Sequence, residues 1–485
     1  MSPVPLSLPR PWADDVVYMI LIDRFHRGSR TTGPAPEPPF HGGNLAGIRE
    51  KLDTLEDLGV TALWLSPVYA NQKDGYHGYW PVDFTSVDPR FGTMEELKAL
   101  VKECHRRGMK VLLDLVLNHA GYDHPMAKDP AKRGWFHQGG QIHWVDQRSL
   151  ERGSLHGLPD FAHEKEEVAC FLIDNALWWL KQTGVDGFRL DAVKHVPVSF
   201  WKRFSLEAHK AAGKDFLLLG EVLRGVPRYI ARYQREAGID SLFDVPFADT
   251  VRSALCRDAE EPGPGLLARL SELWREYRTM LLNEILRKLA ASRSSDLRWF
   301  SALWREERAY ERPELLAPFI DNHDMSRFAT EARPSKPRLE MALALLMTWR
   351  GIPILTYGTE CCLAGRTHGA NRSPMRFDGD PELYAFLRAL IRLRRSVPAL
   401  RTGGQKEIFA DKEVYAFLRE SPESLALTVL NNSRLHQRRT LDLPGKAASA
   451  DWKDAFTGEA FRPERGVLGM RLEPRSARIL LGRPT

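Results

Sequence analysis

Short apolar runs alternate with amphipathic stretches over most of this chain, from about residue 16 to residue 397. Eight of these runs have the length and composition of β-strands, at residues 16–21, 61–66, 110–116, 187–191, 216–222, 241–247, 318–321 and 353–358. Most are separated by segments with helical spacing of apolar positions. Eight strand–helix units predict a closed (β/α)8 barrel. An open doubly wound sheet would require a Gly-rich phosphate loop after an early strand, and the sequence has none.

The segment from Thr93 to Gly108 shows how the local signals agree. Thr93 and Glu96 have the spacing of a capping box, in which each side chain bonds the backbone of the other. Apolar residues then recur at helical spacing from Met94 to Cys104. Gly108 supplies the left-handed residue that ends a helix, so the pattern predicts a helix packed on the barrel and leading into the next strand.

Two stretches depart from this alternation and predict additional domains. Residues 119–165 follow the third strand, are rich in Gly, His, Trp and Asp, and have little periodicity. Beyond residue 402 the chain consists of short strands and turns, which predict a small C-terminal β-sandwich. The predicted domains are a barrel (1–118 and 166–401), an inserted small domain (119–165) and a β-sandwich (402–485). Extra helical patterns within 250–315 are interpreted as a surface embellishment or a lid.

Composition excludes several classes of protein. The 485 residues are 43% hydrophobic and 27% charged, as is usual for a globular enzyme. The net charge of +6 is spread among 63 acidic residues without a basic run, so no nucleic-acid partner is expected. No stretch reaches the roughly 20 apolar residues that cross a bilayer. The N-terminus lacks the basic and then apolar order of a secretory signal, which favours a cytoplasmic location. The sequence does not indicate the oligomeric state.

The five cysteines are an odd number in a long chain and do not form the pattern of a disulfide framework. Two of them, Cys361 and Cys362, are adjacent, and Cys104 lies on the predicted helix at 94–104. We therefore expect free or buried thiols.

Three acidic residues stand where predicted strands end: Asp191, Glu221 and Asp324. A carboxylate at the end of a buried strand is costly to desolvate unless it is paired or takes part in chemistry. Active sites of (β/α)8 barrels gather at the carboxyl ends of the strands. The three acids therefore predict one pocket, suited to attack on a sugar acetal.

Neighbouring residues predict a different state for each of the first two acids. Strand alternation puts Arg189 on the same side as Asp191, and a guanidinium beside a carboxylate keeps it ionised, as a nucleophile must be. Glu221 follows an apolar run, so loss of hydration is expected to raise its pKa and let it hold a proton near neutral pH. Taken alone, Asp191 is equally well explained by an Arg–Asp ion pair that closes the barrel, and Glu221 is better explained by burial in a pair with an arginine.

Two histidines accompany these acids at strand ends. His323 immediately precedes Asp324, and His119 follows Asn118 at the end of the third strand. A single Asn–His or His–Asp pair is weak evidence, because most such residues are satisfied in loops. Polar groups following the third, fourth, fifth and seventh predicted strands together indicate a shared site.

Four segments in this order, DLVLNH (114–119), GFRLDAVKH (187–195), GEV (220–222) and FIDNHD (319–324), resemble the four motifs of the α-amylase family of glycoside hydrolases. The similarity extends to YHGYWPVDF (76–84), LPDF (158–161) and GIPILTYGTE (351–360), and covers about residues 15–400. It implies a catalytic barrel, a small domain inserted after the third strand and a C-terminal β domain. It also implies an α-glucan as the partner molecule.

The resemblance implies a role for each matching residue. Asp191 would be the nucleophile, Glu221 the general acid/base, and Asp324 the carboxylate that distorts and stabilises the sugar. The residues expected around the glucose unit preceding the cut bond are Tyr79, His119, Arg189 and His323. Lys194 and His195 match the contacts of relatives to the glucose on the leaving side, and Asp114 is expected to be structural support.

The resemblance further implies one calcium ion. Asn118, Asp160 and the backbone oxygen of His195 match positions at which relatives bind a calcium that clamps the inserted domain, and hard oxygen ligands suit this ion. The stretch after Phe25 is poor in the Asp and Asn that some secreted relatives use for a further calcium. We therefore expect one ion and not two.

Three functions remain to be weighed. The first is retaining hydrolysis of α-1,4-glucosidic bonds in starch, glycogen or maltooligosaccharides. The second is transfer of the glucosyl unit to a sugar acceptor at the same site, as in cyclodextrin glucanotransferases. The third is a non-catalytic carbohydrate-binding protein, which is disfavoured because all three acids are present.

Overall fold

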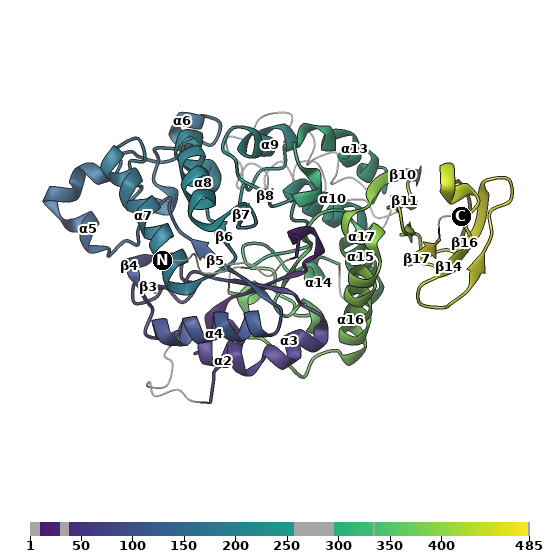
Figure 1. The fold of residues 1–485 in the computed structure, drawn as a ribbon, viewed down its shortest axis with the longest axis horizontal. Coiled ribbons are helices and arrows are strands. Elements are labelled where there is room, and N and C mark those ends of the chain that lie inside the picture. Colours follow the sequence, from purple (N-terminus) through teal and green to yellow (C-terminus); the bar gives the residue numbers. More distant parts are fainter. Residues whose placement is uncertain (1–9, 30–37, 257–294, 333–334, 368, 484–485) are drawn as a thin grey trace. The chain divides into compact units, whose positions relative to one another are not determined.

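The computed structural model describes residues 10–29, 38–256, 295–332, 335–367 and 369–483 (Figure 1). The chain divides into two compact units. The first comprises Met1–Arg224, Tyr229–Phe243 and Arg372–Arg376, and the second comprises Gly225–Arg228, Asp244–Asn371 and Phe377–Thr485. Most of the extra helical pattern predicted within 250–315 lies outside the described residues.

Six strands of the first unit lie side by side in parallel, in the order β8, β7, β6, β5, β2, β1. They are β1 (Val17–Ile20), β2 (Ala62–Leu65), β5 (Lys110–Leu115), β6 (Gly187–Leu190), β7 (Leu217–Gly220) and β8 (Ser241–Leu242). All are buried along their whole length, which explains why the sequence shows continuous apolar runs here instead of alternation.

Helices connect these strands and pack outside them, as α4, α7 and α8 show clearly in Figure 1. The helices that lie wholly or for most of their length in this unit are α1 (Ile22–Phe25), α2 (Leu45–Glu50), α3 (Leu52–Leu58), α4 (Met94–Arg106), α5 (Pro125–Lys128), α6 (Gln147–Leu150), α7 (Glu166–Thr183), α8 (Val198–Ala212) and α9 (Pro227–Arg235). The strand–helix alternation agrees with the predicted fold class.

Helix α4 confirms the prediction made for its segment. Both bonds of the capping box between Thr93 and Glu96 are present. Gly108 has a φ of 73°, the left-handed conformation expected after the last turn. Leu97, Leu100, Val101 and Cys104 are buried, whereas Met94 is only partly covered.

The predicted strand at 241–247 is wrong over most of its length. Strand β8 ends at Leu242, and helix α10 (Val245–Leu255) begins three residues later. Asp244 is the N-cap of α10, because its side chain accepts from the backbone N–H of Phe247, and Pro246 occupies the first turn. Asp followed by Pro is a helix-start signal that the apolar residues around it concealed.

The predicted strand at 318–321 is not a regular strand, although its backbone bonds resemble part of a parallel ladder. Within the second unit, the backbone N–H of Ile352 donates to Leu316 O at 2.8 Å, and that of Ile354 donates to Pro318 O at 2.9 Å. Pro318 itself has no N–H to donate, which limits pairing in this segment. The following strand, β9, covers Ile354–Thr356 within the predicted run.

The segment after the third strand of the parallel sheet has mostly short elements, as its weak periodicity predicted. One isolated bridge, between His119 and Asp160, joins its two ends, and a second, between Phe136 and Phe161, joins its middle to its C-terminal end. The hairpin of β3 (Tyr69–Asn71) and β4 (Pro81–Val87) was not predicted.

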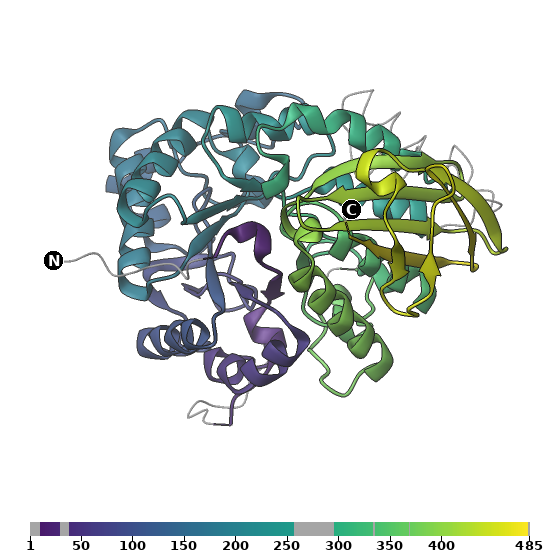
Figure 2. The same ribbon diagram turned by 45° about the vertical axis from the view of Figure 1, so that its right-hand side comes forward.

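The C-terminal region forms antiparallel sheets around its own apolar core, which confirms the predicted β domain (Figure 2). One sheet has the order β10, β11, β12, β17, β14, β15, and β13 pairs with β16. The strands are β10 (Gly404–Ala410), β11 (Val414–Glu420), β12 (Leu425–Asn431), β13 (Gln437–Asp442), β14 (Trp452–Asp454), β15 (Ala460–Phe461), β16 (Val467–Leu472) and β17 (Ser476–Gly482). The other helices of the second unit are α13 (Trp299–Glu306), α14 (Phe328–Glu331), α15 (Lys336–Thr348), α16 (Pro381–Ser396) and α17 (Pro398–Thr402).

All five cysteines are free thiols, as expected, with Cys104 and Cys256 buried. Across the described ranges, no helix combines the length and apolarity that spanning a membrane would require.

Candidate active site

Arg189 is the centre of the polar network in the first unit. It lies on β6, and the parallel register pairs it with Asp114 on β5. Its guanidinium is fully buried and donates from Nη1 to both Asp114 oxygens, at 2.8 and 3.0 Å, and to Asp191 Oδ1 at 2.7 Å. Its Nη2 forms an ion pair with Glu221 Oε1 at 2.9 Å. One guanidinium thus holds carboxylates from three neighbouring strands.

Two opposing effects set the charge of this cluster. Burial favours neutral groups, and attraction between opposite charges favours ionised ones. Burial favours the neutral form of Arg189, but Asp114, Glu221, Tyr79 and Asp191 together raise its pKa well above the ordinary value. The side chain is therefore a fixed cation. The predicted pairing of Arg189 with Asp191 is confirmed, and the pairing with Glu221 is an additional contact.

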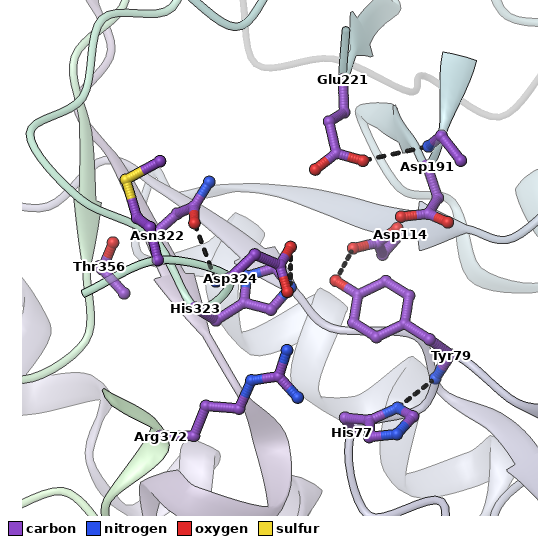
Figure 3. A network of polar contacts seen from close by, with 12 residues as sticks. His77, Tyr79, Asp114, Asp191, Glu221, Asn322, His323, Asp324, Thr356 and Arg372 are labelled. Atoms are coloured by element: carbon purple, nitrogen blue, oxygen red, sulfur yellow. Dashed lines mark hydrogen bonds and ion pairs between the residues drawn. The ribbon is translucent and has the colours of Figure 1, made fainter. Parts of the chain in front are cut away.

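The chain makes a sharp turn directly after Asp191, the first of the two predicted catalytic acids. Ala192 follows Asp191 and has a φ of 50°, a conformation that L-residues rarely adopt. In this turn the N–H of Ala192 donates to Glu221 Oε2 at 3.1 Å (Figure 3). The N–H of Val193 donates to Glu221 O at 3.0 Å. The turn fixes the side chain of Glu221 beside the end of β6.

Asp114 is more than a partner of Arg189. Its Oδ2 also accepts from Trp64 Nε1 at 3.0 Å and from the hydroxyl of Tyr79 at 2.8 Å (Figure 3). Burial raises the pKa of Asp114 to about 6, against the attraction of Arg189. Tyr79, expected to stack under a sugar, is held by its hydroxyl at this carboxylate and stacks with His77 at 5.8 Å between ring centroids.

Burial keeps two of the predicted site histidines neutral. It lowers the pKa of His119 to about 4 and the pKa of His195 to about 3. His119 Nε2 lies 3.0 Å from Tyr79 O, and His195 Nδ1 lies 3.1 Å from Leu150 O. A neutral imidazole facing a carbonyl donates from that nitrogen, which orients both rings.

Lys194 lies beside His195 and is partly exposed. Its ammonium donates to Leu223 O at 2.9 Å, in the segment that follows Glu221.

The second unit holds the remaining predicted residues, His323 and Asp324. His323 Nε2 lies 3.2 Å from Asp324 Oδ2, and the N–H of Asp324 donates to Asn322 Oδ1 at 2.9 Å (Figure 3). The side chain of His323 is 1% exposed, whereas that of Asp324 is 31% exposed. Asn371 Nδ2 donates to His323 O at 2.9 Å, and this bond stabilises the loop that carries His323 and Asp324. Asp324 is therefore the accessible acid of this segment.

The residues predicted to hold calcium partly fit that ion. The Oδ1 atoms of Asn118 and Asp160 are both buried and accept no hydrogen bond in the structure as described. The N–H of Phe161 donates to Asn118 O at 3.0 Å, so the two segments are adjacent. Two orphaned oxygens suit a hard cation. In the described part of the chain, no three His, Cys, Asp or Glu side chains form a metal cluster, so a site here would combine the one carboxylate of Asp160 with amide and backbone oxygens.

A histidine competes for the same carboxylate. His137 Nδ1 lies 2.6 Å from Asp160 Oδ2. Burial raises the pKa of Asp160 to about 7, although His137 opposes this shift. The carboxyl is thus only partly ionised near neutral pH in the absence of a cation.

Two contributors to the site were missed from the sequence. Trp64 reads as one more apolar residue of a buried strand, and only the register with β5 shows that its indole N–H reaches Asp114. Ala192 gives no signal, because Ala has no preference for positive φ.

Comparisons with known proteins agree with this architecture. The family model described as "Alpha amylase, catalytic domain" matches residues 19–380, and "Maltogenic Amylase, C-terminal domain" matches residues 408–479. A "Beta/alpha-amylase" of Paenibacillus polymyxa is 31% identical over 98% of this chain, which spans only 38% of that protein's length.

Two solved structures extend the comparison. The structure of an α-amylase from Geobacillus thermoleovorans complexed with acarbose is similar with a TM-score of 0.85 and 36% identity, covering 98% of this chain and 99% of the other. A cyclomaltodextrin glucanotransferase with a three-domain ABC distribution is similar with a TM-score of 0.79 and 26% identity, covering 98% and 100%. These likenesses confirm the predicted (β/α)8 barrel with a C-terminal β domain.

The role of Arg189 can be tested by its removal. We expect Arg189→Met to lower the free energy of unfolding by about 3–5 kcal/mol, because it leaves buried carboxylates without a counter-charge. Arg203→Met is the matched control, since Arg203 pairs with Glu166 at the surface and such pairs contribute at most about 1 kcal/mol. Urea unfolding of both variants measures the difference, and equal losses would contradict the central role of Arg189.

Proposed function

This chain belongs to the α-amylase family, and we propose that it hydrolyses α-1,4-glucosidic bonds in starch, glycogen or maltooligosaccharides with retention of configuration. The observation that carries the proposal is the buried Arg189, which joins Asp191 and Glu221 at the ends of adjacent strands. Retaining glycosidases use two carboxylic acids roughly 5–5.5 Å apart, one as nucleophile and one as acid/base. Two acids held by one guanidinium suit that requirement.

In the proposed first step, Glu221 donates its proton to the glycosidic oxygen and the bond from that oxygen to the anomeric carbon breaks. A carboxylate oxygen of Asp191 attacks the anomeric carbon, and a covalent glucosyl-enzyme forms. Asp191 is suited to this role because Arg189 keeps it ionised. The shorter glucan leaves with the proton from Glu221.

In the second step, Glu221 takes a proton from water, whose oxygen attacks the anomeric carbon and releases Asp191. The α-configuration is restored by this second inversion. Burial of Glu221 favours the protonated acid, whereas Arg189 favours the carboxylate. These opposed influences suit a group that must donate a proton in one step and accept one in the next.

The remaining predicted residues take roles in binding the sugar. We assign Asp324 the stabilisation of positive charge at the anomeric carbon, which its exposed carboxylate supports. His119 and His323 would contact sugar hydroxyls, and Tyr79 would pack against the glucose unit before the cut bond. Lys194 and His195 would contact the glucose unit on the leaving side.

Asn118, Asp160 and the backbone oxygen of His195 would hold one calcium ion, which when bound would clamp the inserted segment to the barrel. The orphaned oxygens of Asn118 and Asp160 support this assignment. The ion would have no part in bond cleavage.

The second candidate is transfer of the glucosyl unit to another sugar. The similarity to a cyclomaltodextrin glucanotransferase over 98% of this chain favours keeping glucosyl transfer as a candidate function. Transfer uses the same acids and differs only in that a sugar hydroxyl replaces water in the second step. A non-catalytic role is disfavoured, because Asp191, Glu221 and Asp324 are all present.

Asp191→Asn tests the mechanism directly. We expect it to lower kcat on soluble starch by at least about 10³-fold, because it removes the nucleophile. Asp174→Asn, an exposed change on α7, is the matched control and should retain full activity. Proton NMR of the fresh wild-type products should show the α-anomer first. Unchanged sugar release from Asp191→Asn would exclude the proposed mechanism.

The products formed from maltotriose separate hydrolysis from transfer. A hydrolase should give glucose and maltose from the start of the reaction. A transferase should give maltotetraose and longer or cyclic products from the start, together with the glucose or maltose that leaves in the first step. Chromatography of early time points at low and high maltotriose concentration measures the ratio. We expect shorter products to dominate at low concentration, where water has no competing acceptor.

Calcium should stabilise the protein more at pH 8 than at pH 5. Without the ion, the raised pKa of Asp160 contributes stability that is present below about pH 4 and is lost as pH rises through about 7. Calcium binds the ionised form, so it should offset that loss by about 2.7 kcal/mol at a hundredfold excess over its Kd. Calorimetry with calcium or EDTA measures this, and equal calcium stabilisation of Asp160→Asn would refute the assignment.

A further inference from the structure

Two adjacent cysteines of the second unit have no role in the proposed reaction. Cys361 ends a short 3-10 turn, Thr359–Cys361, and Cys362 follows it directly. Both residues are partly exposed, whereas Cys104 and Cys256 are buried. A small oxidant in solution can therefore reach both members of this pair.

Cys362 has an unusual backbone conformation. Its φ of 58° and ψ of 38° lie in the left-handed region, which L-residues other than Asn and Asp rarely adopt. Backbone bonds hold this turn, because the N–H of Cys362 donates to Thr359 O at 3.2 Å and the N–H of Leu363 donates to Gly358 O at 2.9 Å. Backbone strain of this kind persists only where the surrounding structure imposes it, and it gathers at functional sites and switch regions.

Both thiols have surroundings that suit the reduced state. Cys361 Sγ donates to Gly358 O at 3.2 Å. Burial raises the pKa of the Cys362 thiol, and Asp380 adds to this shift while Lys336 opposes it. Because the thiolate is the reactive form of cysteine, the pair is protected against weak oxidants.

A disulfide between adjacent residues must change the backbone. The two Cα atoms are about 3.8 Å apart across a trans peptide, whereas ordinary disulfides join Cα atoms about 4.4–6.8 Å apart. Ring closure therefore requires rotation about the bonds that flank the peptide between Cys361 and Cys362. Gly379 limits movement on one side, because it packs so closely on Cys361 that a side chain at 379 would overlap the Cβ of Cys361. The rotation is then taken up by the residues after Cys362.

The segment directly after the pair holds the loop that carries Asp324. Asn371, at the end of this segment, donates from Nδ2 to His323 O at 2.9 Å and to Met325 O at 3.0 Å. These two carbonyls belong to the residues on either side of Asp324. The position of Asp324 therefore depends on the position of Asn371.

A second set of bonds joins the start of the same segment to the residues after Asp324. The N–H of Arg327 donates to Gly365 O at 2.9 Å, and Ser326 Oγ donates to Arg366 O at 3.0 Å. A backbone shift at the cysteine pair would therefore reach the loop of Asp324 at more than one point.

We propose that Cys361 and Cys362 form a redox switch, in which a peroxide closes the two thiols to a disulfide and the resulting backbone change displaces Asp324 and lowers sugar cleavage. The effect on cleavage rests on the proposed function of Asp324, whereas formation of the disulfide does not. A strained disulfide is easily reduced, so a dithiol reductant reverses the change.

The oxidation takes two steps. The thiolate of one cysteine attacks a peroxide oxygen, the O–O bond breaks, and the other oxygen leaves with the thiol proton as water, which gives a sulfenic acid. The second thiol then attacks the sulfenic sulfur, the S–S bond forms, and the sulfenic oxygen leaves with the second thiol proton as water. Two thiols have been oxidised to one disulfide, and hydrogen peroxide has been reduced to two molecules of water.

Thiol counting tests the disulfide without any assay of activity. After treatment with hydrogen peroxide and unfolding, we expect the free thiols to fall by two, from five to three. A proteolytic peptide that contains both Cys361 and Cys362 should lose the mass of two hydrogen atoms. Cys361→Ser, whose hydroxyl can still donate to Gly358 O, should form no disulfide. Disulfides to Cys170 or between two copies of the chain, in place of one within this peptide, would overturn the proposal.

Activity on soluble starch tests the consequence of oxidation. We expect peroxide to lower wild-type kcat/KM by at least about fivefold, and dithiothreitol to restore it. Cys361→Ser should have wild-type activity before treatment and keep it afterwards, and Cys362→Ser gives the same comparison should Cys361→Ser fold poorly. Cys170→Ser removes a partly exposed thiol outside the pair and is the matched control, which should respond as the wild type does. Equal loss in the wild type and in the variants of the pair, or a loss that dithiothreitol does not reverse, would overturn the switch.

Hydrogen exchange measured by mass spectrometry locates the displacement. Oxidation should speed exchange of the amides of residues 322–327 in the wild type and leave them unchanged in Cys361→Ser. A disulfide that forms without any change in this exchange would overturn the switch, even if activity fell. If Asp191→Asn retains hydrolysis, the proposed mechanism is wrong, and the thiol count and the exchange still decide the switch.

Discussion

The buried guanidinium of Arg189 is the interaction on which the site of the first unit depends. A cation without water must be balanced where it stands, and Asp114, Asp191 and Glu221 supply the balance from three adjacent strands. Three carboxylates carry more negative charge than one guanidinium can balance. The raised pKa of Asp114 reduces that excess, because this acid can hold a proton when its neighbours are ionised. A shift of one residue in the register of β5 or β6 would turn these side chains to the opposite face and leave the charges unpaired.

This constraint explains which parts of the fold could be predicted from the sequence. The buried parallel strands and helix α4 were predicted well, because apolar runs and a capping box are local signals. The β8–α10 junction was misread, since the N-cap role of Asp244 becomes evident only when the helix is known to start there. The segment at 318–321 forms ladder-like bonds without being a regular strand, and only tertiary contacts determine that.

The candidate site shows the same division between local and tertiary information. The pairing of Arg189 with Asp191 was predictable, because strand alternation places residues two apart on one face. The contact of Arg189 with Glu221 was not, since it depends on the register between β6 and β7. That contact changes the chemistry. It places a fixed cation beside Glu221, whereas the apolar run that precedes this acid in the sequence suggests only apolar surroundings.

The inserted segment lies next to the residues that follow Asp191 in the chain. Its ends are joined through His119 and Asp160, and its middle carries Trp144 next to Lys194. Lys194 and His195 follow Asp191 closely in the chain, and both contact the inserted segment, through Trp144 and Leu150. A shift of that segment would therefore displace the residues directly after the proposed nucleophile. Hydrolysis and transfer would use the same acids and the same guanidinium, because bond cleavage is common to both. The choice between the two outcomes must then be made by elements such as this segment, whose sequence the shared motifs do not constrain.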